Sequence, residues 1–217
     1  MTLRNSSRLW TFAVPVVVGI LLSGCSKGQD RAESPELGRC KSLLGAENVE
    51  AAVKATGGND VEVSGTPQAD ALAAALVKEA EKWQESDLMH TSYTGCRLDA
   101  FEGDQPSGTV DVSVKWSVLS LESMDDPKAG RTWRQVNGLV YVAPEPGPAR
   151  MQLVAACAVP GAAASQSTGL PLQFQVTGAD LGAELRWELL RTFAQSVTEE
   201  MGCTTSPVIP SELPAAA

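Results

Sequence analysis

The chain has 217 residues, of which 43% are hydrophobic and 20% charged, so it can bury one sizeable apolar core. Acidic residues outnumber basic ones by 26 to 17, which gives a formal net charge of −9 at pH 7. Such a surface repels phosphate groups, so no nucleic acid is expected among the partners.

The first 24 residues have the three parts of a secretory signal peptide. Arg4 and Arg8 occur without any acidic residue, an apolar stretch follows over 9–22, and small residues precede Cys25. A membrane-spanning helix is the alternative, but the stretch is shorter than the ~20 residues that a span needs, and Pro15 interrupts it. Loss of the signal removes only those two arginines, so 15 basic and 26 acidic residues remain and the formal net charge becomes −11.

The end of the signal decides what kind of exported protein this is. Leu22-Ser23-Gly24-Cys25 resembles the lipobox, at which a cysteine thiol receives diacylglycerol before the chain is cut in front of it. Acyl chains contribute ~0.8 kcal/mol for each buried methylene, and two chains anchor far better than one. We therefore predict a lipid anchor on Cys25 that holds the protein to the extracytoplasmic face of the cell membrane.

Both ends of the mature chain are predicted to be irregular. Residues 25–39 are polar, contain glycine and proline, and lack apolar periodicity, which is typical of a flexible tether. Residues 204–217 contain three prolines and are expected to form a disordered tail. Between them, residues 40–203 contain neither a second linker nor a repeat, so we predict one domain.

The domain begins with helical patterns. Apolar residues between Leu43 and Val53 predict a first helix that ends at Gly57-Gly58. Val61 and Val63 predict a short strand, and Thr66-Pro67 has the residues of a helix N-terminus. The apolar stripe of this second helix has four members at helical spacing: Leu72, Leu76, Ala80 and Trp83.

Strands are predicted in the middle of the domain. Over 110–118 apolar and polar residues alternate strictly, as they do when one face of a sheet is buried. The same pattern recurs less strictly over 135–142, 150–159 and 170–176. Asp125-Asp126-Pro127 and the proline-rich residues 144–148 have turn chemistry, so neighbouring strands are expected to pair as an antiparallel meander.

A long final helix completes the predicted fold. It is expected to start near Asp180 and to end at Gly202, before Cys203. Its apolar residues recur every four positions: Leu181, Leu185, Leu189, Phe193, Val197 and Met201. Since this face must be covered, we predict an α+β fold in which an antiparallel β-meander sheet is covered by N-terminal helices and the long C-terminal helix.

Four cysteines remain besides Cys25: Cys40, Cys96, Cys157 and Cys203. An even number in an exported chain predicts two disulfides, for which the sequence alone allows three connectivities. Free buried thiols or metal ligands are the alternative, but the spacings are too wide for a Cys-x-x-Cys metal site. We expect these disulfides to stabilise the fold and to take no part in catalysis.

Residues that carry chemistry in other proteins form no recognisable motif here. His90 is the only histidine and lacks a Gly-x-Ser-x-Gly motif, so we interpret it as solvent-exposed or capping. Asp125 and Asp126 are interpreted as a solvated loop, with a weak cation site as the alternative. Residues 57–60 lack the lysine of a phosphate loop and are interpreted as a helix stop and turn. Four tryptophans are assigned to the core or its margin rather than to a ligand groove: Trp83, Trp116, Trp133 and Trp187.

Several of these features together resemble a group of small actinobacterial cell-surface lipoproteins of unknown function. They are the lipobox, Cys40 followed by a Leu-Leu pair, Cys157 with Pro-Gly shortly after it, and a closing Gly-Cys at Cys203. The domains of that group are similar in outline to the sandwich-like α+β folds of PsbP-type proteins and of actinobacterial kinase sensor domains. The resemblance implies that Cys40 pairs with Cys96 and Cys157 with Cys203, and it implies no activity.

The functional hypothesis follows from the anchor, the tether and the missing catalytic set. We expect a non-enzymatic lipoprotein without cofactor or metal, whose domain binds a small apolar ligand or an envelope protein partner. The alternative is an envelope hydrolase that pairs carboxylates from distant segments, which sequence alone cannot select.

Overall fold

The structure is a computed structural model that describes residues 33–126, 133–143, 149–205 and 207–214. The predicted signal peptide, Cys25 and residues 26–32 of the predicted tether lie outside these ranges. Glu33–Ala217 form one compact unit. Within the described ranges, no helix is both long and apolar enough to cross a membrane.

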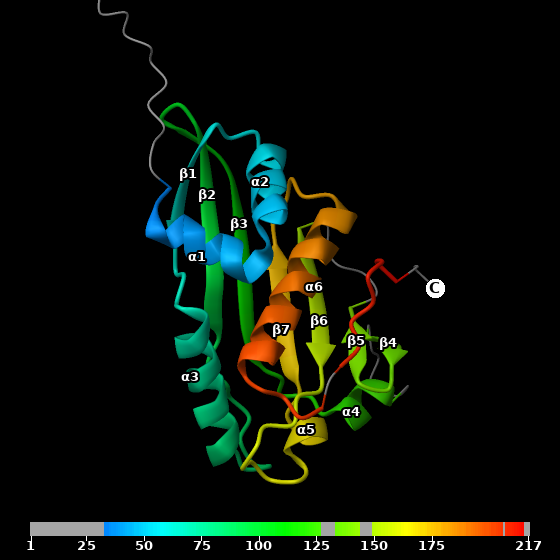
Figure 1. Ribbon diagram of the computed structural model, residues 1–217. Coiled ribbons are helices and arrows are strands. Elements are labelled where there is room, and N and C mark those ends of the chain that lie inside the picture. The colour runs from blue at the N-terminus through cyan, green and yellow to red at the C-terminus, as the bar shows by residue number, and fades with distance from the viewer. Residues whose placement is uncertain (1–32, 127–132, 144–148, 206, 215–217) are drawn as a thin grey trace, which may run out of the picture. The chain divides into compact units, whose positions relative to one another are not determined.

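One antiparallel sheet of seven strands is the centre of this part of the chain. The strands are β1 (Asp60–Ser64), β2 (Tyr93–Glu102), β3 (Gln105–Trp116), β4 (Arg134–Asn137), β5 (Val140–Val142), β6 (Arg150–Ala155) and β7 (Leu172–Thr177). Their order in the sheet is β1-β2-β3-β7-β6-β5-β4 (Figure 1). Two meanders, β1 to β3 and β4 to β7, therefore meet where β3 pairs with β7, which confirms the predicted antiparallel sheet.

The longer helices cover one face of the sheet. The described helices are α1 (Pro35–Leu44), α2 (Ala46–Ala55), α3 (Ala69–Lys82), α4 (Leu121–Asp125), α5 (Gln166–Gly169) and α6 (Ala183–Glu200). In Figure 1, α1, α2 and α6 lie in front of the sheet, and α3 lies beside them at the β2 side. This confirms the predicted α+β arrangement of N-terminal helices and a long C-terminal helix over one sheet.

The main core lies between the sheet and these helices because side chains alternate along each strand. In β3, every second residue from Val110 to Trp116 is buried, as the sequence predicts. In β7, Leu172, Phe174 and Val176 are buried in the same way. A smaller apolar cluster on the other face contains residues of α4, β5 and β6 and the residue just after β6: Leu121, Met124, Tyr141, Val154 and Ala156.

The N-terminal helical region differs from its prediction in two ways. The single expected helix is two helices, because Gly45 between α1 and α2 has a φ of 85°, which only glycine adopts easily. In addition, α1 begins at Pro35, inside the predicted tether, with the hydroxyl of Ser34 accepting a hydrogen bond from the N–H of Leu37. The tether prediction is therefore wrong for residues 35–39.

The strand predictions need two corrections. The sequence reasoning missed β2, although Cys96, Leu98 and Ala100 alternate there with exposed or half-buried polar residues. The single strand expected over 135–142 is instead the β4–β5 hairpin, whose turn is closed when the side-chain oxygen of Asn137 accepts from the N–H of Leu139.

The C-terminal segment packs against the domain, which corrects the expected disorder for residues 207–214. It has no regular element, as its prolines predict, but Ile209 is only 6% exposed. The side chain of Asn137 donates to the carbonyl of Val208 at 2.8 Å, and that of Arg134 donates to the carbonyl of Pro214 at 2.8 Å. The segment thus runs beside β4.

Candidate functional site

The four cysteines form the two disulfides that the resemblance implies. Cys40 of α1 pairs with Cys96 of β2, and Cys157, just after β6, pairs with Cys203, just after α6. Their sulfurs therefore hold helices on the sheet and are not available as metal ligands or nucleophiles. The prediction of a stabilising role is consistent with this placement.

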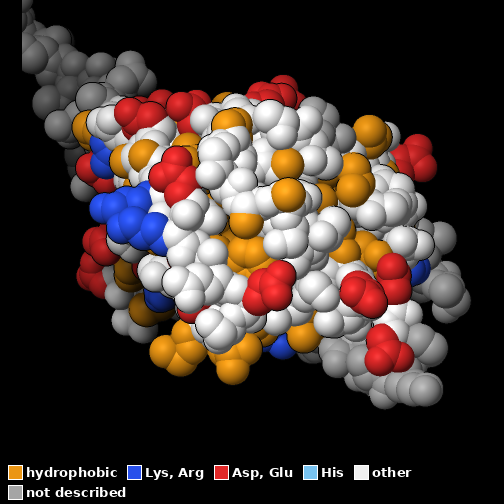
Figure 2. Space-filling view, turned by 90° about the horizontal axis from the view of Figure 1, so that it is seen from below, with side chains coloured by type: hydrophobic (Ala, Val, Ile, Leu, Met, Phe, Trp, Pro, Cys, Tyr) orange, Lys and Arg blue, Asp and Glu red, His pale blue; other side chains and the backbone are white. Residues whose placement is uncertain are grey.

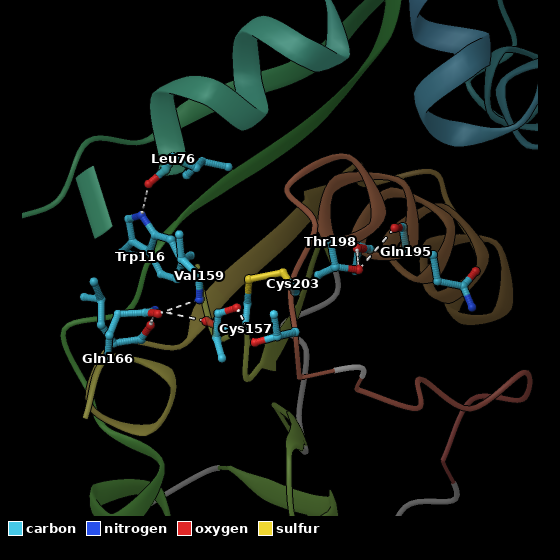
Figure 3. The surroundings of a disulfide bond; sticks show 12 residues. Leu76, Trp116, Cys157, Val159, Gln166, Gln195, Thr198 and Cys203 are labelled. Atoms are coloured by element: carbon cyan, nitrogen blue, oxygen red, sulfur yellow. Dashed lines mark hydrogen bonds between the residues drawn. A yellow bond between two sulfur atoms is a disulfide. The ribbon is translucent and has the colours of Figure 1, made fainter. Parts of the chain in front are cut away.

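Polar side chains near the second disulfide form hydrogen bonds to the backbone of the protein itself (Figure 3). Gln166 is buried, accepts from the N–H of Val159 at 3.0 Å, and donates to the carbonyls of Cys157 and Leu170 at 3.0 and 3.1 Å. Nearby, the indole of Trp116 donates to the carbonyl of Leu76 at 3.0 Å. These groups fix the loop between β6 and β7 and leave little capacity to bind a ligand.

The interface between the sheet and α6 is filled by side chains. Phe193 of α6 is completely buried and meets Phe174 of β7 edge to face, with ring centroids 5.7 Å apart. Its ring also lies directly over Gly95, where an added Cβ would come within 2.5 Å of the ring. A ligand site must therefore be sought at the margins of the core.

A groove at one margin combines an apolar floor with charged side chains. It lies between α1, α2 and β1 and has a volume of about 380 Å³. We call it the α1–α2 groove and define it by its lining residues: Leu37, Lys41, Val49, Glu50, Val53, Lys54, Gly57, Gly58 and Val61.

The local fold explains why this groove is apolar inside. Val49 and Val53 stand one turn apart on α2, and Leu37 and Val61 reach toward them from α1 and β1. The turn that closes the groove passes close to β2, since a Cβ on Gly58 would lie 2.7 Å from the Cβ of Ala100. Glycine is therefore required there, a role beyond the predicted helix stop.

Charged groups are arranged around the groove. The ammonium of Lys41 lies 3.2 Å from a carboxylate oxygen of Glu33 and 3.0 Å from one of Glu50. These hydrogen bonds, first that of Glu50 and then that of Glu33, raise the pKa of Lys41 and keep it protonated. Lys54, which is on α2, adds a second ammonium group to the lining of the groove. The groove can therefore accept an apolar body and place a polar group of the ligand beside its ammonium and carboxylate groups.

His90 is neither exposed nor a helix cap, which corrects its interpretation from sequence. Its ring is only 3% exposed, and Nδ1 lies 3.0 Å from Oε1 of Glu79. The same carboxylate accepts from the N–H of Thr91 and from the hydroxyl of Tyr93, both at 3.3 Å. Burial, and secondarily the charge of Glu79, raises the pKa of Tyr93. These contacts fix the start of β2 to α3.

Two carboxylates bear on the hydrolase alternative. Asp99 of β2 accepts from Arg97 and Thr109, and the hydrogen bonds of Arg97 are the main cause that lowers its pKa. Asp111, opposite Arg97 on β3, has its pKa raised by burial. Opposite shifts occur in catalytic pairs, but both side chains lie on the sheet face away from the main core, and neither of them lines the α1–α2 groove.

The other residues singled out from sequence take structural places. Asp125 ends α4 and Asp126 follows it, and the described residues contain no group of three or more His, Cys, Asp or Glu side chains that could hold a metal. Trp116 and Trp187 are buried in the main core, whereas Trp83 is partly buried at the margin of that core and Trp133 at the margin of the smaller cluster. The assignment of these tryptophans to the core or its margin is therefore confirmed.

Comparisons with protein-family models, with curated proteins and with solved structures find no match to this chain. The resemblance to actinobacterial lipoproteins therefore stays a prediction from the motifs.

Sequence reasoning did not identify the α1–α2 groove as a site. Leu37 stood in the predicted tether, and Val49 and Val53 were assigned to a core-facing helix. One signal was present, because Glu50 and Lys54 are four residues apart on the same helix and flank those valines. That the groove stays partly open depends on where β1 and α1 lie, which only the fold shows.

Proposed function

We propose that this protein is a non-enzymatic lipoprotein of the extracytoplasmic face, anchored by acyl chains on Cys25, and that it binds a small apolar ligand in the α1–α2 groove. The groove is the one observation that carries the binding proposal. Its volume of about 380 Å³ is similar to that of small-molecule sites, which start at roughly 300 Å³. Its floor is apolar, and ammonium and carboxylate groups flank it.

The anchor is supported by the lipobox and by the disulfides. Two disulfides in a chain of this size fit an oxidising compartment outside the cytoplasm, which an exported lipoprotein would reach. The acidic composition also favours a domain held near the membrane by its anchor, since its own surface is not attracted to anionic lipid.

Mass spectrometry of the protein from its native membrane tests the anchor. We expect an N-terminal peptide that begins at Cys25 and carries the mass of attached acyl chains, because Ser23-Gly24 allow cleavage there. A Cys25→Ala variant should lose the added mass and leave the membrane fraction. A lipid-free N-terminus at another residue of the wild-type protein would contradict the proposal.

A binding titration of the soluble domain, residues 33–217, tests the groove with 1-anilinonaphthalene-8-sulfonate, an apolar dye with one anionic group. We expect saturable fluorescence, and Val53→Asp should raise the Kd about tenfold, because it places a charge among apolar groups. Val208→Asp is the matched control, since Val208 is 75% exposed and lies outside the groove. Equal weakening by both variants, or no saturation, would contradict a binding site in the groove.

A further inference from the structure

The floor of the α1–α2 groove is only partly covered by the protein itself. Val49 is buried, but Leu37, Val53 and Val61 stay partly exposed although they pack against the main core. These three side chains come from α1, α2 and β1, so apolar surface of three elements meets in one hollow. Because removal of apolar surface from water is favourable, an apolar chain laid along this floor is stabilised there.

The volume of the groove fits one hydrocarbon chain. A methylene group takes up about as much space as a water molecule, roughly 30 Å³, so a groove of about 380 Å³ holds roughly a dozen methylenes. The two chains of a membrane phospholipid would exceed this volume. The groove therefore favours a ligand with a single chain of about twelve carbons.

Lys41 is already neutralised by the protein. Its ammonium lies 3.2 Å from a carboxylate oxygen of Glu33 and 3.0 Å from one of Glu50. Two carboxylates on one ammonium more than balance its charge, so Lys41 offers no net attraction to a further anion. A charged head group must be recognised by another residue of the groove.

Lys54 is the cation that remains for a ligand. It lies one turn after Glu50 on α2, the spacing at which a glutamate and a following lysine commonly pair. Glu50 instead bonds to Lys41, and among the residues that the structure describes no carboxylate lies within ion-pair distance of Lys54. Lys54 thus brings an ammonium without a protein partner to the lining of an apolar groove.

Charge elsewhere on the protein does not prevent an anion from binding at Lys54. The chain is acidic, and Figure 2 shows carboxylates spread over the face seen from below, with lysine and arginine side chains gathered mainly at one side. Charges more than about 8 Å apart are largely screened at physiological ionic strength, so an anion responds mainly to the nearest groups. Glu50, which also lines the groove, disfavours a second negative charge such as a phosphate monoester carries. The head group should therefore be a monoanion.

We propose that the ligand of the α1–α2 groove is a fatty acid of about twelve carbons, whose chain covers the apolar floor and whose carboxylate pairs with Lys54. This inference rests on the proposed binding function and adds the chemical class of the ligand. The chain supplies most of the affinity because it buries apolar surface, and the ion pair selects the head group. An exposed ion pair contributes little, so the carboxylate should lower the Kd only about threefold to fivefold relative to an uncharged head group.

Isothermal titration calorimetry of residues 33–217, which form one compact unit, tests the ligand class. The probes share one chain and differ in charge: dodecanoate, glycerol monododecanoate and dodecyltrimethylammonium, each kept below its micelle concentration. We expect saturable binding, tightest for dodecanoate and weakest for the cation. Equal affinities for dodecanoate and the uncharged ester would overturn the fatty acid proposal and leave the groove as an apolar site. Absence of binding by all three probes would overturn the proposed binding function as well.

Variants of Lys54 test the ion pair. Lys54→Gln should abolish the preference for dodecanoate over the uncharged ester, whereas Lys54→Arg should keep it, because the arginine retains the charge. Lys78→Gln is the matched control, since Lys78 is exposed on α3 and lies outside the groove. Thermal unfolding verifies that the variants are folded. A preference that survives Lys54→Gln, or that falls equally in Lys78→Gln, would overturn the role of Lys54.

Discussion

Replacing Cys157 and Cys203 together with alanine is expected to lower the free energy of unfolding by about 4 kcal/mol. The disulfide joins residues 46 positions apart, and a cross-link of that span restricts the unfolded chain by roughly this amount in the loop-entropy description. In a domain of this size the Tm should fall by roughly 8–16 °C. Urea denaturation followed by circular dichroism measures the change.

The other disulfide supplies the control for this experiment. Cys40 and Cys96 are 56 residues apart, so their double alanine variant should lose a similar free energy, about 4 kcal/mol. Reduction of the wild-type protein under unfolding conditions should lower its midpoint at least as far as either variant does. Alanine variants with the wild-type midpoint would show that these bonds do not stabilise the fold.

Periodic burial made much of the fold predictable from sequence. The residues of β3 alternate strictly because one face of this strand lies in the main core, where Trp116 donates to the carbonyl of Leu76 on α3, while the other face is partly exposed. The four-residue spacing of α6 reflects the same requirement for a helix, so its buried side was predicted through Leu189, Phe193 and Val197. Where a strand or helix buries a single face, the sequence pattern and the structure agree.

The elements that were missed depend on contacts between distant residues. The apolar side of β2 is made of Cys96, Leu98 and Ala100, small or medium residues that give a weak strand signal, and Gly95 beside them weakens it further. That glycine is present because the ring of Phe193, almost one hundred residues later, occupies the space above it. No local pattern contains this information.

Two further predictions failed because the deciding feature is not visible in the local sequence pattern. They are the single helix expected across Gly45 and the exposed or capping position expected for His90. Gly45 separates α1 from α2 although the sequence around it favours helix on both sides, because its positive φ turns the chain. His90 is buried because Glu79, on the preceding helix, accepts from it and from its neighbours. A single histidine in a polar segment carries no sign of such a partner in the sequence.

The position of the α1–α2 groove follows from the closed core. Since side chains fill the space between the sheet and α6, this groove forms at the margin, where α2 ends beside β1. The end of α2 could not be located from sequence to within the one or two residues that decide whether a groove exists. The candidate site in this fold therefore depends on where elements end more than on any motif.

Replacing Phe193 with alanine should destabilise the protein by about 4 kcal/mol, because a fully buried ring that bridges α6, β2 and β7 leaves a cavity behind. Gly95→Ala should also destabilise the wild type, by about 1–3 kcal/mol, since its Cβ would collide with the same ring. In the Phe193→Ala background, however, the added methyl group enters vacated space, so the second substitution should cost almost nothing. Urea denaturation of the two single variants and the double variant measures this coupling. Strictly additive losses would mean that the ring does not lie over Gly95, and the account of how α6 seals the sheet would then be wrong.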